Sequence, residues 1–288
     1  MKCVTRLFFL SSVLALSAAD VTTQALPEFG SAVEFDSSGP QPTLAKLKGK
    51  AVLIIFFKSR FGLSSSFGND FFADFQKTHG NNRGLALIAI KTDGGSVSSA
   101  KDYLKAIGAN LSLWVVGCDT EAKYYKQVAD DDDFWGYVLV GSDGTIIRKG
   151  SVLSYFVGGT SKRFVLADPK LVSDCGELKT VLPSDKQYDP SMIGLVRMAE
   201  MGEAEKALLL CNASLNKPKE RQAAVALKAD LQPIIEKRLE ERVSILSDTL
   251  KPSSARYDAL LELTQMTKDL KTTLPSATKI APLLSKVR

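Results

Sequence analysis

The sequence predicts an α/β fold followed by a small all-α domain, and three observations lead to this class. Apolar runs at 51–57 and 85–90 are typical of buried strands, and a segment with helical spacing separates them. Strands that alternate with helices are typical of layered α/β proteins. From Asp189 onward the composition shifts to Ala, Leu, Glu, Lys and Met, which favours helices.

The α/β part begins after a stretch, 20–45, that is rich in Ser, Gly, Pro and Thr. Strands are expected where apolar residues form short runs, and helices where they recur at intervals of three and four. A Ser142-Asp143-Gly144 turn joins the last two strands into a hairpin. The expected strands are 32–35, 51–57, 85–90, 111–116, 137–140 and 145–148, and the expected helices start near Ser64 and cover 97–107 and 121–129.

The C-terminal part is predicted to be helical. Before it, residues 152–157 and 163–167 could pair as strands around Gly158-Gly159. Pro233 should kink or divide one helix, and Met201–Ala207 resembles the turn of a tetratricopeptide-type hairpin. The expected helices are 191–201, 203–215, 219–250, 254–272 and 277–287, and the expected domains are 20–182, with a core at about 26–150, and 183–288.

Composition and charge exclude one class of partner. Hydrophobic residues make up 45% and charged residues 24% of the 288 positions, which are ordinary proportions for a globular protein of one or two domains. The formal net charge is only +5, and Lys and Arg are not clustered. Nucleic-acid binding requires a stronger and more localised excess of positive charge. We therefore expect no nucleic-acid partner.

The N-terminus has the pattern of a secretory signal peptide over residues 1–19. A basic start, Met1–Arg6, precedes an apolar run, Leu7–Leu16, and the small residues Ser17-Ala18-Ala19 favour cleavage before Asp20. An apolar run of this length is too short to span about 30 Å of hydrocarbon. We therefore expect an exported protein without stable membrane insertion after cleavage.

The segment Leu47–Ser64 resembles extracytoplasmic thioredoxin-like proteins, or redoxins, of the TlpA/ResA type. In that family a Gly-Lys pair, a buried strand and a turn lead to a helix whose start carries a redox-active Cys-x-x-Cys pair. This sequence has Gly49-Lys50, the strand 51–57 and the turn Lys58–Ser64, and its hairpin Tyr137–Ile146 matches the family's last hairpin. The resemblance covers roughly residues 26–150 and implies a thioredoxin-like fold in a periplasmic or secreted protein of a bacterium.

The residues that carry the family's chemistry are replaced. The two cysteine positions fall at Phe61 and Ser64, and the cis-proline position falls at Trp135, or at Gly136 if the register slips by one. Disulfide exchange needs a thiolate, whereas a serine hydroxyl stays protonated at neutral pH. Ser64-Ser65-Ser66 is better interpreted as a helix N-cap. The active site is degenerate, and no catalytic residue or cofactor is expected there.

The remaining thiols leave an enzymatic alternative open. After signal cleavage the cysteines are Cys118, Cys175 and Cys211. Cys118 ends a central strand beside Asp119 and is the candidate thiol of a thiol–disulfide oxidoreductase or peroxide-reducing redoxin with a non-standard cysteine. Cys175 and Cys211 could form a disulfide in an oxidising compartment. The only histidine, His79, is expected in a solvated loop at a helix end.

The leading hypothesis is a redox-inactive module that binds a protein or peptide partner in the envelope. Phe61, Phe134 and Trp135 could form an exposed aromatic patch for such a partner, or could lie buried. Lys58 and Arg60 could hold an anion with the helix N-terminus, or could simply be solvated. The acidic run 130–133 lacks the spacing of a calcium loop, so no metal is expected. A third possibility is a soluble ligand-binding or structural envelope component that works through its helices.

Overall fold

The computed structural model describes residues 24–61, 65–129, 135–152, 155–158, 161–248 and 250–270, together with 274, 276–278, 280 and 284. The expected signal peptide lies outside these residues, and so do Ser64, the acidic run 130–133 and Phe134. The side chain of Phe61 and most of the helix expected at 277–287 also fall outside the description.

One six-stranded mixed sheet organises the N-terminal part, with the strand order β1-β4-β3-β2-β5-β6. Strands β2, β3 and β4 are parallel to one another, whereas β1, β5 and β6 join antiparallel to their neighbours. The strands are β1 Glu34–Phe35, β2 Ala51–Phe57, β3 Leu85–Lys91, β4 Val115–Cys118, β5 Trp135–Val140 and β6 Ile146–Ser151. The helices of this part are α1 Leu44–Leu47, α2 Ser65–His79, α3 Val97–Ala106 and α4 Lys123–Val128.

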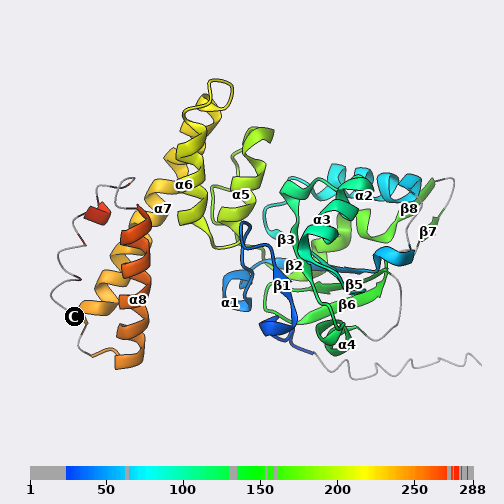
Figure 1. Cartoon of the computed structure of the whole chain (residues 1–288), viewed down its shortest axis with the longest axis horizontal. Helices are drawn as coiled ribbons and strands as arrows, with labels where there is room; N and C mark the ends of the chain where they lie inside the picture. The colour runs from blue at the N-terminus through cyan, green and yellow to red at the C-terminus, as the bar shows by residue number, and fades with distance from the viewer. Residues whose placement is uncertain are drawn as a thin grey trace, which may run out of the picture.

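The helices cover both faces of the sheet (Figure 1). α2 and α3 contribute to the buried cluster on one face, while α1 and α4 contribute to the cluster on the other. The side chains of β2 alternate between these clusters, with Ile55 and Phe57 facing α2 and α3, and Ile54 and Phe56 facing α4. A strand buried on both faces needs apolar residues at every position, which explains the unbroken run at 51–57.

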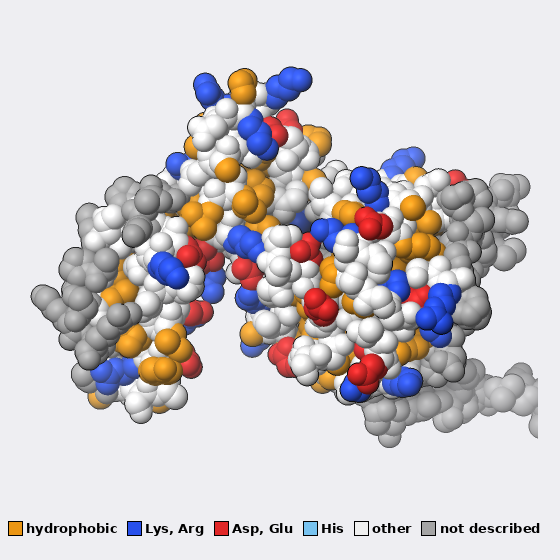
Figure 2. All heavy atoms as spheres, viewed as in Figure 1, with side chains coloured by type: hydrophobic (Ala, Val, Ile, Leu, Met, Phe, Trp, Pro, Cys, Tyr) orange, Lys and Arg blue, Asp and Glu red, His pale blue; other side chains and the backbone are white. Residues whose placement is uncertain are grey.

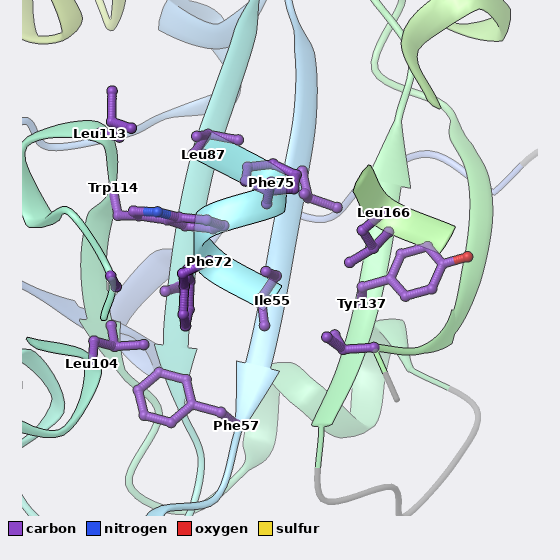
Figure 3. Close-up of a cluster of buried hydrophobic side chains, with 14 of the residues drawn as sticks. Ile55, Phe57, Phe72, Phe75, Leu87, Leu104, Leu113, Trp114, Tyr137 and Leu166 are labelled. Atoms are coloured by element: carbon purple, nitrogen blue, oxygen red, sulfur yellow. The ribbon is translucent and has the colours of Figure 1, made fainter. Parts of the chain in front are cut away.

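Aromatic side chains fill much of the space between α2 and the sheet (Figure 3). The Trp114 ring lies 5.8 Å from Phe72 and 5.4 Å from Phe75 between ring centroids. Phe57 stacks on Tyr103 of α3 at 5.7 Å. Each such ring contributes about 1.5–3 kcal/mol through removal of apolar surface from water. Phe71, Phe72 and Phe75 are therefore core residues of α2.

This order of elements, strand–helix–strand–helix–strand–helix–hairpin with β2 central, is the thioredoxin-like fold. The predicted fold class is confirmed, including the α/β part, the hairpin of β5 and β6, and the helical region that follows. The expected pairing after residue 151 is also present, as a separate hairpin of β7 Tyr155–Gly158 and β8 Ser161–Phe164.

The strand expected at 111–116 is displaced along the chain. A 3₁₀ helix, η3 Leu111–Leu113, occupies its first half, and β4 begins only at Val115. The Asn110 side chain accepts a hydrogen bond from the Ser112 backbone N–H at 3.1 Å, which closes a turn at that point. This local side-chain bond competes with strand pairing, so the apolar run is divided between two elements.

Four helices form the C-terminal part, and each packs on the next along the chain. They are α5 Ile193–Glu200, α6 Ala204–Ser214, α7 Arg221–Ser247 and α8 Ser253–Leu270. Gly202 has φ 84°, so glycine suits the tight turn between α5 and α6. Pro233 lies inside α7 and does not divide it. Buried residues on both sides, such as Leu231 and Ile235, hold the helix together against the proline's cost of about 3 kcal/mol.

Short 3₁₀ helices connect several of these elements. They are η1 Gly30–Ala32, η2 Ser59–Phe61, η4 Val165–Ala167, η5 Pro169–Cys175 and η6 Pro190–Met192. Among the helices described, none has the length and apolar character needed to cross a membrane.

Candidate functional site

The position that the resemblance assigns to the redox pair begins where β2 ends and the turn η2 follows. Asp93, just beyond β3, holds this turn, because its Oδ2 accepts hydrogen bonds from the Ser59 hydroxyl at 3.0 Å and from the Arg60 backbone N–H at 2.9 Å. Its Oδ1 lies 2.8 Å from the Lys91 ammonium. Burial would raise the pKa of Asp93, but the hydrogen bonds from Lys91, Arg60 and Ser59 outweigh burial and lower the pKa to about 2.

This arrangement gives the turn a structural anchor. The Arg60 backbone N–H donates to Asp93 and is therefore not available to an anion held by Lys58 and Arg60. The Arg60 side chain is exposed, and the Lys58 ammonium lies 6.0 Å from the centroid of the Tyr125 ring. A negative charge beneath the turn would also repel an incoming anion.

Trp135 does not belong to an exposed patch, which corrects one of the two interpretations above. Its side chain is 0% exposed, and its ring centroid lies 5.5 Å from Phe57 and 6.4 Å from Tyr103. β5 pairs with β2 on one side and β6 on the other, so its first residue is enclosed between the sheet and α3. The side chains of Phe61 and Phe134, which would complete the patch, lie outside the described residues.

Cys118, the candidate thiol, has surroundings that keep it protonated. It is only 1% exposed, and its Sγ lies 3.7 Å from the Gly95 carbonyl oxygen. Burial raises the pKa of the thiol, and this effect outweighs the positive charge of Lys91, its neighbour across the strand pair. Asp119 adds a smaller contribution in the same direction, as expected.

Cys175 and Cys211 do not form the disulfide that we considered. Cys175 belongs to the core between the sheet and α2, whereas Cys211 belongs to the helical core. Both are buried free thiols, as is Cys118. Burial raises the pKa of Cys175 to about 11 and also raises the pKa of Cys211.

His79 is buried, so the prediction of a solvated loop position is wrong. It is the last residue of α2, is 2% exposed, and has Nε2 3.1 Å from the Asp168 carbonyl oxygen. The segment that contains η4 and η5 covers this end of α2. The local sequence around His79 gives no indication of this contact. Burial lowers the pKa of the imidazole and outweighs the hydrogen bonds to Asp168 and Leu166.

A second candidate site lies between the sheet and α5. A cavity of about 400 Å³ opens where the start of β3, the segment 111–116 and α5 meet. Its walls are largely apolar, and the paired charges of Asp36 and Lys101 stand at its rim. Sequence reasoning missed this site because its residues come from well-separated segments and share no motif or period. The apolar residues that line the cavity include Leu85, Leu113, Leu195, Met198 and Met201.

A cluster of buried charges borders the same cavity. The Lys50 ammonium lies 2.7 Å from Glu200 Oε2, and Arg83 Nη1 lies 3.9 Å from Glu200 Oε1. Arg197, on α5, donates to the backbone carbonyls of the loop after α2, including Gly80 at 2.6 Å and Asn82 at 2.8 Å. The cluster therefore holds three cations around one carboxylate.

The pKa values in the cluster reflect this excess of positive charge. Burial lowers the pKa of Lys50, Glu200 opposes the shift, and Arg197 and Arg83 lower the pKa further. Burial also lowers the pKa of Arg197 to about 10, and the charge of Arg83 acts in the same direction. The charged forms of Lys50 and Arg197 are thus disfavoured first by burial and then by the neighbouring positive charges.

No protein-family profile matches this chain, and no curated protein matches it. Among solved structures it is similar to a putative protein disulfide isomerase from Bacteroides thetaiotaomicron, with 24% identity over 45% of this chain and 77% of the other and a TM-score of 0.37. A thioredoxin-family thiol:disulfide interchange protein from Chlorobium tepidum TLS has 18% identity over 55% and 99% of the two chains, with a TM-score of 0.39. A putative thioredoxin from Neisseria meningitidis has 23% identity over 45% and 79%, with a TM-score of 0.34.

The sheet topology described above defines the class: a thioredoxin-like protein of α/β type with a helical C-terminal region. The sequence of this chain contains no Cys-x-x-Cys pair. The part of the chain that the structure describes holds no cluster of His, Cys, Asp and Glu able to bind a metal ion.

Proposed function

We propose that this protein is an exported, redox-inactive thioredoxin-like module that binds a protein or peptide partner in the envelope. The observation that carries the proposal is the state of its thiols. Thiol–disulfide exchange requires an accessible thiolate close to a second sulfur. Cys118, Cys175 and Cys211 are buried and unpaired, and burial raises the pKa of each.

The alternative, an oxidoreductase or peroxide-reducing redoxin that uses Cys118, has one feature in its favour. Lys91 lies beside the thiol and its charge lowers the pKa. The effect is insufficient, because burial raises the pKa by more and the Lys91 ammonium is already paired with Asp93. The geometry therefore supports the binding module better than the enzyme.

Support for a binding role comes from the helical part. α7 and α8 extend away from the sheet (Figure 1), and hydrophobic side chains are visible among the charged ones on their surface (Figure 2). Tyr257 and Leu261 are 60% and 52% exposed and lie one turn apart on α8. Exposed apolar side chains that adjoin on a helix are common in surfaces that bind proteins. Export is supported by the signal-peptide pattern at 1–19.

Titration of the native thiols with a chromogenic disulfide tests the redox-inactive part of the proposal. We expect slow reaction of Cys118, Cys175 and Cys211 in native buffer and rapid reaction of all of them in denaturant. The Cys118→Ser variant is the control. A thiol that reacts rapidly in the native protein, and that disappears in this variant, would favour the enzymatic alternative.

Site-specific photo-crosslinking tests the binding part. A photoreactive residue at Tyr257 should give a discrete crosslinked product with an envelope protein, and the same residue at Glu240, an exposed position on α7, should not. Equal or absent crosslinking at the two positions would contradict a partner surface on α8.

A further inference from the structure

We propose that the cavity between the sheet and α5 binds a small amphipathic anion, an apolar body that carries one carboxylate. This inference goes beyond the proposed function, because it concerns a small-molecule site and does not depend on the protein partner. It rests on the shape of the cavity, on its apolar walls and on the composition of the charge cluster at its border.

The size and position of the cavity suit a small ligand. Ligand sites typically occupy about 300–1,000 Å³ and often lie between domains. This cavity measures about 400 Å³ and lies between the α/β part and the first helix of the helical part. Its apolar walls come from both parts, including Leu85 from β3 and Leu195 and Met198 from α5. An apolar body of modest length would bury its surface against all of these walls.

The charge cluster explains why the ligand should be an anion. Lys50, Arg83 and Arg197 surround the single carboxylate of Glu200, and all four border the cavity. Burying cations without an equal number of anions is costly, so a cluster of this composition favours an additional negative charge. The lowered pKa values of Lys50 and Arg197 agree with this excess.

Two donors in the cluster have no hydrogen-bond acceptor among the described residues. They are Nη1 of Arg83 and Nε of Arg197, on side chains that are at least nine-tenths buried. Unmet buried donors are rare in folded proteins, because each destabilises the folded state. Guanidinium groups form strong, directed hydrogen bonds with carboxylates. A ligand carboxylate seated between Arg83 and Arg197 would satisfy these donors and reduce the excess charge.

Gly194 provides a variant that blocks the cavity with little risk to folding. It lies in the first turn of α5 and lines the cavity, and a Cβ added there would meet only the Ser112 side chain, with its Cβ at 3.7 Å and its Oγ at 3.9 Å, which are ordinary contacts. Replacing a glycine within a helix by leucine also favours the helix, because leucine has the higher helix propensity. Gly194→Leu should therefore fill the cavity and preserve the fold, whereas Arg83→Gln removes one carboxylate contact and leaves the space open.

Isothermal titration calorimetry of the full mature chain with octanoate, octanol and acetate tests the proposal. We expect octanoate to bind at one site, Gly194→Leu to abolish this binding, and Arg83→Gln to weaken it by about tenfold. Octanol should bind far more weakly than octanoate, and acetate should not bind. Failure of octanoate to bind, equal binding of octanol, or unchanged binding by Gly194→Leu would each overturn the proposal. Circular dichroism of both variants verifies that they are folded.

Discussion

Glu200 of α5 and Lys50, next to β2, form a buried ion pair of 2.7 Å across 150 positions of the sequence. The Glu200 carboxylate also accepts hydrogen bonds from the backbone N–H groups of Val181 at 2.7 Å and Leu182 at 3.3 Å. One side chain thus joins the sheet, the connecting segment and the first helix of the C-terminal part. Lys50 of the Gly49-Lys50 pair therefore has a structural partner.

Replacement of Glu200 by glutamine should destabilise the protein severely. The change leaves Lys50, Arg83 and Arg197 without their only carboxylate, and loss of one partner of a buried pair costs about 3–5 kcal/mol. Urea denaturation of Glu200→Gln measures this cost. The double variant Lys50→Met, Glu200→Met is the comparison and should lose less stability than Glu200→Gln, because the buried Lys50 charge is removed with its partner while Arg83 and Arg197 remain in both variants. A loss below about 1 kcal/mol for Glu200→Gln would show that the pair is not important.

Limited proteolysis should cut the chain first at 183–190, where most residues are exposed. The two fragments should nevertheless remain associated in native buffer. Glu200 of α5 forms an ion pair with Lys50 next to the sheet, and Arg197 donates hydrogen bonds to the loop after α2. Gel filtration of the nicked protein, with and without urea, tests this. Separation of the fragments without urea would mean that the boundary at 182/183 divides two independent domains. A first cut within the sheet would contradict the α/β assignment.

His79 should make the protein less stable in mild acid. Burial lowers its folded-state pKa below the ordinary value of 6.5, so the unfolded chain binds the proton more tightly. The stability that the neutral side chain contributes is fully present above pH 6.5 and is lost as the pH falls through the lowered pKa. Urea unfolding from pH 7.5 to 5 should therefore show a smaller decline for His79→Gln than for the original protein. Parallel declines in the two proteins would assign the pH dependence to other groups.

The predicted alignment can be tested by restoring the cysteine pair. Phe61→Cys with Ser64→Cys places two thiols at i and i+3 across a helix start, within the Cα separation limit of about 7 Å for a disulfide. We expect this double variant to form an internal disulfide, detected by mass spectrometry after alkylation. The single variant Phe61→Cys is the control. Absence of the disulfide under oxidising conditions would show that the register of residues 61 and 64 is wrong.

Local patterns predicted the strands well, and tertiary contacts explain what they missed. β2 and β3 were predictable because both faces are buried, which leaves an unbroken apolar run. From the sequence, Trp135 could be either exposed or buried. Its position in β5, between β2 and β6, explains why the side chain is buried. The burial of His79 depends on a segment 89 residues away.

The cavity beside α5 could not be predicted from the sequence, for a similar reason. Lys50, Arg83, Arg197 and Glu200 each have an ordinary local context, and only the folded chain brings them together. The redox position assigned to Phe61 and Ser64 is the opposite case. That assignment rests on the local sequence alone, on the strand and turn that surround the two residues, and it stays a prediction.

The most direct test of the redox-inactive assignment is an insulin-reduction assay of the mature protein with a thiol donor. We predict turnover no higher than that of a variant in which Cys118, Cys175 and Cys211 are all replaced by serine, because each thiol is buried with a raised pKa. Turnover clearly above that of the cysteine-free variant would contradict the account and identify the protein as a working oxidoreductase.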